Sequence, residues 1–148
     1  MRTTLFAAAA AALLAACGPA AGTREPDAAL TKAAVEDGAK IAAVMVFAEW
    51  CSSCKVMDPK IAAVRARGEV EGVDHIVLDF TERDPADFFA QAEAAGVGPA
   101  IREEFSDEIL TGVVILVDVD DQKAVADLRK ELTEDEIADI IQWKLAEA

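Results

Sequence analysis

A run of apolar residues from Ile41 to Ala48 limits the folds open to this chain more than any other feature. It does not alternate polar with apolar residues, and such a run is typical of a strand that is covered on both faces. Covering both faces takes helices on each side of a sheet. The chain has 148 residues, of which 53% are hydrophobic, so one domain with a packed core is expected.

The rest of the chain supplies the elements for such a sheet. Parallel strand–helix–strand units, a hairpin and a closing helix predict an α/β fold, a three-layer α/β/α sandwich with a central mixed sheet. Segment 96–110 is the least readable and offers one turn of helix from Ile101 to Phe105. The expected strands are 41–48, 73–81, 112–119 and 123–128, and the expected helices are 28–39, 52–67, 85–95 and one that begins after Thr133.

Local signals mark several helix ends and the core. Asp84 and Pro85 suit the cap and first position of a helix, and Thr133 with Glu136 forms a capping box. Gly38 and Gly68 are the expected helix stops. The core is expected to contain Phe88, Phe89 and Trp143, whereas His75 is expected at a strand end or on the surface. The apolar face of the last helix is expected to consist of Ile137, Ile140, Ile141 and Leu145.

Charge excludes two classes of partner. Asp and Glu number 28 against 14 Lys and Arg, so the formal net charge is −14. A nucleic-acid-binding protein needs a basic face to replace the counterions of phosphate, which argues against that class. The same excess of acid argues against electrostatic adhesion to anionic lipid.

Two cysteines stand where the first apolar strand gives way to a helix, in Cys51-Ser52-Ser53-Cys54. Two cysteines at this spacing can close a disulfide at a helix start. The unpaired N–H groups and the dipole of a helix N-terminus stabilise a thiolate, which is the attacking species in disulfide exchange. We therefore expect Cys51 to be the nucleophile and Cys54, deeper in the helix, to be the resolving thiol.

Other uses of two such cysteines fit this sequence less well. A purely structural disulfide would close too short a loop to remove much entropy from the unfolded chain. Zinc would need two more ligands, and the only histidine, His75, has no second cysteine pair beside it. Covalent haem attachment requires histidine directly after the second cysteine, where this chain has Lys55. We expect no metal and no cofactor.

The stretch from Val44 to Lys55, with Pro59 five residues after Cys54, resembles the active site of the thioredoxin superfamily. Members have an apolar strand, Ala-x-Trp-Cys-x-x-Cys-Lys, and a proline that kinks the active-site helix at this spacing. The resemblance covers residues 28–148 in element order. It implies a thioredoxin-like fold, in which Trp50, Lys55 and Pro59 support the dithiol.

Two departures from the superfamily pattern concern the surroundings of the dithiol. The family has a proline with a cis peptide bond just before the third strand, where this chain has Thr111 or Gly112, depending on the alignment, and a trans peptide is expected. Many thioredoxins also keep a buried acid in the first strand, where this chain has Met45. Glu49 is nearby and expected to be more exposed.

The N-terminus resembles the signal peptide of bacterial lipoproteins. The apolar run from Leu5 to Ala16 is shorter than the ~20 residues that span a bilayer. It ends in Leu14-Ala15-Ala16-Cys17, which is similar to a lipobox. The resemblance implies cleavage after residue 16, a lipid on Cys17, a tether over 17–27 and a domain over 28–148.

These features together predict a thiol–disulfide oxidoreductase of the bacterial cell envelope, lipid-anchored to a membrane and facing the periplasm. It would act on protein thiols and disulfides and, as a reductant, would need a membrane thiol-relay electron donor. The alternative is a binding or chaperone module, or a metal-delivery module, that uses the same fold with little catalytic activity. The two departures motivate that alternative.

Overall fold

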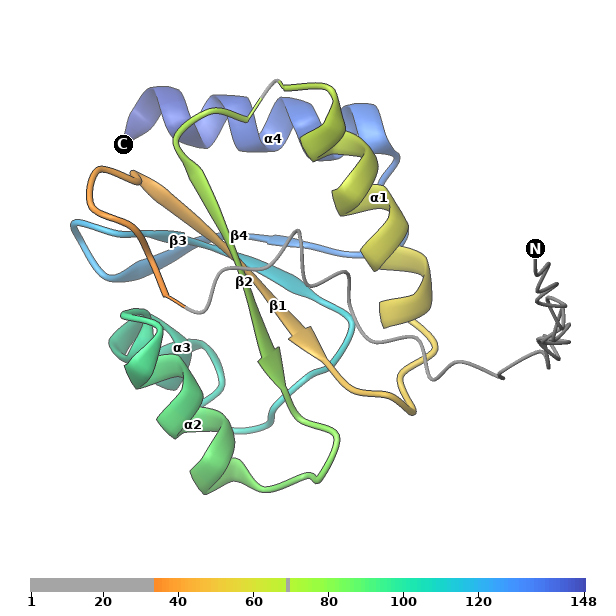
Figure 1. The fold of residues 1–148 in the computed structure, drawn as a ribbon, viewed down its shortest axis with the longest axis vertical. Coiled ribbons are helices and arrows are strands. Elements are labelled where there is room, and N and C mark those ends of the chain that lie inside the picture. Colours follow the sequence, from red (N-terminus) through yellow and green to blue (C-terminus); the bar gives the residue numbers. More distant parts are fainter. Residues whose placement is uncertain (1–33, 69) are drawn as a thin grey trace, which may run out of the picture.

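The computed structural model describes residues 34–68 and 70–148, and the expectations for the signal segment, Cys17 and the tether lie outside them. The described chain contains a four-stranded sheet in the order β2-β1-β3-β4 (Figure 1). β1 pairs with β2 in parallel and with β3 antiparallel, so the sheet is mixed. The strands are β1 (Ile41–Phe47), β2 (Val73–Asp79), β3 (Val114–Asp118) and β4 (Lys123–Leu128).

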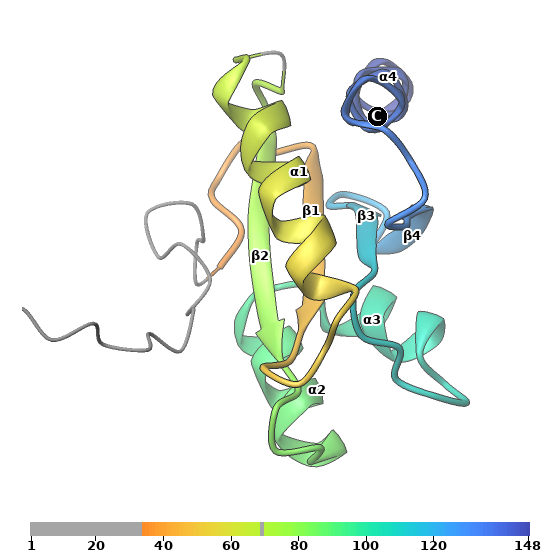
Figure 2. The same ribbon diagram turned by 90° about the vertical axis from the view of Figure 1, so that its right-hand side faces the viewer.

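Helices cover both faces of this sheet, which confirms the predicted three-layer α/β/α arrangement. Figure 1 shows α1 and α4 on one side and α2 and α3 on the other, and Figure 2 looks onto α1 where it runs beside β1 and β2. The helices are α1 (Cys54–Ala66), α2 (Pro85–Ala94), α3 (Gly98–Glu104) and α4 (Glu134–Glu147).

β1 is the centre of the core because all seven of its residues are buried. Its side chains alternate between the two layers, as successive residues of a strand must. Met45 and Phe47 belong to the apolar cluster that contains residues of α1 and α4, while Val44 and Val46 belong to the cluster that contains residues of α2 and α3. The apolar run therefore packs against both helical layers, and its carboxyl end is held firmly where the cysteines follow.

The helix caps that the sequence signals are present. The Asp84 side chain accepts a hydrogen bond from the Ala86 N–H at 2.9 Å, and Pro85 is the first residue of α2. At α4 the Thr133 side chain accepts from the Glu136 N–H, while the Glu136 carboxylate accepts from the Thr133 N–H. Each contact satisfies a donor that a helix end leaves free.

The helix predicted over 28–39 is wrong for its described part. Residues 34–39 form a bend and a turn, with Gly38 at a φ of +94°. The backbone N–H of Val35 donates to the carbonyl of Ala95, and that of Glu36 donates to the Asp74 carboxylate. These donors are used by distant parts of the chain, so they are not available for a local helical ladder.

Two side chains lie elsewhere than predicted. Trp143 is 59% exposed rather than in the core, because it follows Ile141 by two residues and so points away from the buried face of α4. His75 is 6% exposed rather than at the surface, since it lies on the face of β2 that α1 covers. Phe88, by contrast, is fully buried as predicted, and Phe89 packs at the edge of the same cluster.

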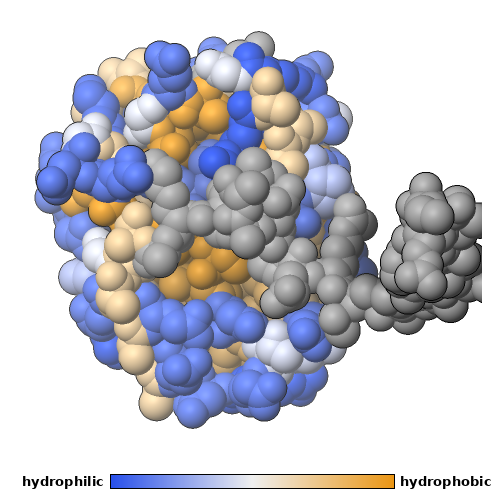
Figure 3. All heavy atoms as spheres, viewed as in Figure 1, coloured by the Kyte–Doolittle hydropathy of each residue, from blue (hydrophilic) through white to orange (hydrophobic). Residues whose placement is uncertain are grey.

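Segment 96–110 holds more structure than predicted. α3 spans Gly98–Glu104, whereas the sequence indicated a single turn from Ile101. Figure 3 shows hydrophobic residues in two areas toward the middle of this face, while most of the rim is hydrophilic. None of the helices in the described ranges is long and apolar enough to cross a bilayer.

Candidate functional site

Cys51 and Cys54 lie where β1 passes into α1, and they form a disulfide with a Cα–Cα distance of 5.4 Å. The chain leaves β1 at Phe47 and reaches Cys51 through a turn in which the Cys51 N–H donates to the Ala48 carbonyl at 3.0 Å. Cys51 is 4% exposed and Cys54 is fully buried. Of the two cysteines, Cys51 is therefore the one that retains contact with solvent.

The start of α1 is directed at the sulfur of Cys51. The backbone N–H of Cys54 donates to the Cys51 Sγ at 3.0 Å, while the N-cap residue Ser53 makes no side-chain cap hydrogen bond. The helix begins at Cys54 rather than at Ser52, so Cys54 is its first residue instead of lying a turn inside it, and Cys51 lies just outside it as expected. One of the free donors of the helix N-terminus thus points at a sulfur atom, an arrangement that favours negative charge there.

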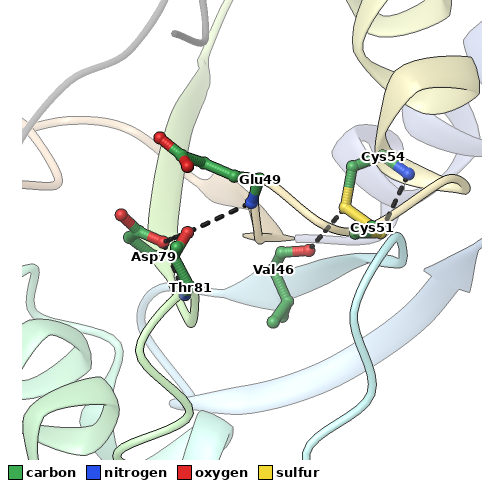
Figure 4. Close-up of a disulfide and its surroundings, with 6 residues drawn as sticks. All are labelled: Val46, Glu49, Cys51, Cys54, Asp79 and Thr81. Atoms are coloured by element: carbon green, nitrogen blue, oxygen red, sulfur yellow. Dashed lines mark hydrogen bonds between the residues drawn. A yellow bond between two sulfur atoms is a disulfide. The ribbon is translucent and has the colours of Figure 1, made fainter. Parts of the chain in front are cut away.

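The sulfur of Cys54 faces an acceptor instead. It lies 3.6 Å from the carbonyl oxygen of Val46 (Figure 4). In the disulfide this sulfur carries no hydrogen, so the contact becomes a hydrogen bond only when the thiol forms on reduction. The same oxygen accepts the Gly112 N–H at 2.8 Å. The two sulfurs therefore differ: the surroundings of Cys51 stabilise a thiolate, and those of Cys54 stabilise a thiol.

Gly112 lies against the disulfide from the segment before β3. A Cβ at this position would overlap the Ser53 Cβ and would lie 3.1 Å from the Cys51 Sγ and 3.1 Å from the Cys54 nitrogen. Gly112 also has a φ of +78°, which side-chain-bearing residues rarely adopt. Gly112, one of the two residues that the alignment left open, therefore lies against the dithiol. The described residues contain no cis peptide bond.

The remaining predicted site residues differ in their exposure and in the element that carries them. Trp50 is in the turn before Cys51 and is 46% exposed. Lys55 is exposed in the first turn of α1, and Pro59 lies within the same helix beyond that turn. Met45, at the place of the buried acid, is 5% exposed in the same apolar cluster as Cys54, and Glu49 is exposed.

Two residues near the site carry no signal in the sequence. Thr81 and Arg83 follow β2 and contact the turn that leads to Cys51, through Glu49 and Trp50 respectively. Their partners are about thirty residues away in the chain, so no local pattern marks them. They border a cleft of about 210 Å³ whose lining includes five acidic side chains: Glu49, Asp79, Glu82, Asp84 and Asp87.

Within residues 34–68 and 70–148, no three histidine, cysteine or acidic side chains gather as a metal site would require. The groups that the structure brings together at the site are the two sulfurs, the Cys54 N–H and the Val46 carbonyl. A disulfide at a helix start, with one sulfur facing a donor and the other an acceptor, can open and reform by thiol exchange.

Comparison with known proteins found similar structures but no similar sequence family. No protein-family model matches the chain, and no curated protein matches it. Among solved structures, Trxlp from Edwardsiella tarda EIB202 is 18% identical, with 78% of this chain and 92% of that chain covered and a TM-score of 0.48.

Two further structures are similar at the same level. StoA from Bacillus subtilis is 10% identical, with 70% of this chain and 83% of that chain covered and a TM-score of 0.47. A disulphide isomerase from Xylella fastidiosa Temecula1 is 16% identical, with 73% and 79% covered and a TM-score of 0.45. At these identities and TM-scores, the function of this chain has to be argued from its own residues.

Proposed function

We propose that this protein is a thiol–disulfide oxidoreductase of thioredoxin-like fold that acts through Cys51 and Cys54. The observation that carries the proposal is the opposite polarity around the two sulfurs. The Cys51 Sγ accepts the N–H of Cys54 at 3.0 Å, whereas the Cys54 Sγ lies 3.6 Å from the Val46 carbonyl oxygen. A purely structural disulfide has no need of this asymmetry, while an exchange reaction needs one sulfur as the nucleophile and the other held in reserve.

In the reducing direction the reaction has two steps. The Cys51 thiolate attacks a substrate disulfide, so a mixed disulfide forms and one substrate sulfur leaves as a thiolate. The Cys54 thiol then loses its proton and attacks the Cys51 Sγ, which releases the second substrate sulfur and closes the Cys51–Cys54 disulfide. Two electrons pass to the substrate, whose two sulfurs take up two protons, one equivalent to that lost by Cys54 and one from water. The reverse sequence oxidises a substrate dithiol.

The test of the exchange reaction is reduction of insulin disulfides by the full chain with dithiothreitol as the reductant. We expect wild type to exceed the uncatalysed rate, Cys51→Ala to fall to background, and Cys17→Ser to match wild type. Cys54→Ala should accumulate mixed disulfides that can be isolated and identified. If wild type and Cys51→Ala give the same background rate, the protein is not an oxidoreductase, and the binding or chaperone alternative is favoured.

The direction of the reaction is set by the reduction potential of the Cys51–Cys54 couple. Titration against a glutathione series measures it directly. A value near −270 mV would make the protein a reductant that draws electrons from a membrane thiol-relay partner, and a value near −120 mV would make it an oxidant, by analogy with characterised couples of about those potentials.

The place of action is a further part of the proposal. Residues 1–16 direct the chain to the cell envelope, Cys17 carries the lipid, and the domain faces the periplasm on a short tether. This rests on the lipobox-like Leu14-Ala15-Ala16-Cys17. Cys17→Ser should move the protein from the membrane fraction to the soluble fraction, and unchanged sedimentation would rule out the lipid anchor.

A further inference from the structure

The turn that delivers Cys51 has its two middle residues at the surface. The Cys51 N–H donates to the Ala48 carbonyl at 3.0 Å, so Glu49 and Trp50 occupy the bend between them. Both are exposed, and neither belongs to the two apolar clusters. A surface turn of this kind is mobile unless other groups hold it. The position of the Cys51 Sγ depends on how firmly this turn is fixed.

Thr81 holds both middle residues of that turn. The Glu49 N–H donates to the Thr81 Oγ1 at 3.1 Å, and the Trp50 indole N–H donates to the Thr81 carbonyl at 2.9 Å. Figure 4 shows Thr81 on one side of this segment and the disulfide on the other. A single residue, Thr81, thus accepts a hydrogen bond from each of the two residues that precede Cys51.

Arg83 adds a third contact from the same loop. Its guanidinium carbon lies 4.2 Å from the centroid of the Trp50 ring, within the range of a cation–π interaction. Arg83 has a φ of +56°, which is unusual for a residue with a side chain, and its N–H donates to the Phe80 carbonyl at 3.1 Å. Contacts around the loop therefore have to hold the Arg83 backbone in a conformation that this residue does not favour.

The loop itself is fastened to the sheet and to α2. One carboxylate oxygen of Asp79, at the end of β2, accepts the Thr81 N–H at 2.8 Å and the Thr81 hydroxyl at 2.6 Å. The Gln91 side chain accepts the Asp79 N–H at 2.8 Å and donates to the Asp79 carbonyl at 3.0 Å. Because the Thr81 hydroxyl proton is given to Asp79, a lone pair of its oxygen is left for Glu49.

We propose that Thr81 and Arg83 are positioning residues, which fix the turn 48–51 and thereby the Cys51 sulfur in the geometry needed for disulfide exchange. They act through Glu49 and Trp50 and do not touch the sulfurs. The proposal rests on the proposed function, since it concerns the reactivity of the same dithiol. It extends the site to a loop that no feature of the dithiol motif indicates.

The test uses the full chain with Trp143→Phe and Cys17→Ser as background, which leaves Trp50 as the only tryptophan and the dithiol as the only cysteines. In this background, Thr81→Val removes the hydroxyl while keeping the side chain nearly the same size, and Thr81→Ser restores the hydroxyl. Arg83→Gln removes the cation, and Arg83→Lys restores it. Arg102→Gln is the matched control, because the Arg102 guanidinium lies 4.9 Å from the Phe89 ring centroid, away from the dithiol.

Two readouts report on the turn and on the sulfur. Acrylamide quenching of Trp50 fluorescence measures how freely the indole is exposed. The second-order rate of insulin reduction measures exchange. We expect Arg83→Gln to lower that rate about two- to fivefold, the factor that corresponds to a cation–π contact at an exposed site. Thr81→Val should lower it about two- to tenfold, as expected for a lost hydrogen bond. Quenching should rise in both variants.

Rescue separates positioning from a general loss of stability. Thr81→Ser and Arg83→Lys should recover most of the rate and of the quenching protection, and Arg102→Gln should change neither. Wild-type rate and quenching in both Thr81→Val and Arg83→Gln would overturn the inference and leave the proposed function standing. If the background protein shows no exchange at all, the proposed function fails, while the quenching series alone still decides whether the loop fixes the turn.

Discussion

Replacing Gly112 by alanine tests the claim that this residue is fitted to the dithiol. The new Cβ would overlap the Ser53 Cβ and would lie 3.1 Å from the Cys51 Sγ. It would also place a side chain on a backbone with a φ of +78°. Gly96 provides a matched control, because its φ is +79° and a Cβ there would meet nothing within 4 Å.

The two variants separate the backbone cost from the steric cost. A left-handed backbone costs a residue with a side chain about 1–2 kcal/mol, and this applies to Gly96→Ala and Gly112→Ala alike. Overpacking at a tight site adds about 1–3 kcal/mol, and this applies only to Gly112→Ala. We therefore expect Gly112→Ala to lower the free energy of unfolding by about 1–3 kcal/mol more than Gly96→Ala does.

Urea unfolding of the oxidised proteins, followed by far-ultraviolet circular dichroism, measures this difference. The rate at which dithiothreitol opens the disulfide should also change in Gly112→Ala, because the overlap pushes on Ser53 and on the sulfur of Cys51. Gly96→Ala should open at the wild-type rate. Equal unfolding free energies for the two variants, together with equal opening rates, would refute the idea that the dithiol requires a glycine at this place.

Further predictions concern the helices and the core. Thr133→Ala should lower the free energy of unfolding by about 1 kcal/mol through loss of the α4 cap, as measured by urea unfolding, and an unchanged midpoint would contradict it. Hydrogen bonds from the Thr133 backbone N–H, and next from the Thr133 hydroxyl, hold the pKa of Glu136 below its ordinary value. Ionised Glu136 therefore stabilises the fold at pH values above its pKa in the unfolded chain, and this stabilisation is lost as the pH falls through its pKa in the folded protein. Glu136→Gln should therefore flatten the loss of stability on acidification below about pH 4.3, and an unaltered pH profile would disprove the linkage. Phe88→Ala should cost about 3–5 kcal/mol in the same urea assay, whereas Trp143→Ala should stay within about 0.5 kcal/mol, and comparable losses would contradict the observed burial.

The parts of the fold that the sequence predicts well are those with local causes. A continuous apolar run gives β1, because only a strand covered on both faces can bury all seven of its residues. Asp84 and the Thr133–Glu136 pair mark the starts of α2 and α4, because each side chain satisfies a backbone donor a few residues away.

The features that the sequence does not predict have distant causes. The turn at residues 37–38 follows from the contacts of Val35 with Ala95 and of Glu36 with Asp74, and no pattern within the segment encodes those partners. The burial of His75 depends in the same way on α1, which covers its strand.

The candidate site likewise contains residues that local sequence predicts and residues whose positions depend on distant parts of the chain. Cys51 and Cys54 are three positions apart in the sequence, so their pairing at a helix start could be expected from spacing alone. The position of Gly112 against the sulfurs depends on the register of β3 with β1, which the sequence leaves open by one residue. The contacts of Thr81 and Arg83 with the turn 48–51 depend on where β2 ends relative to β1, and only the assembled sheet shows it.

We propose that the surroundings of the two sulfurs make Cys51 the nucleophile. The most direct test measures the rate of iodoacetamide alkylation against pH for the reduced Cys17→Ser protein, with the labelled cysteine identified by mass spectrometry. We expect alkylation of Cys51 before Cys54, with a midpoint below the value of about 8.5 for a free cysteine. Alkylation of Cys54 first, or a Cys51 midpoint at or above about 8.5, would contradict it.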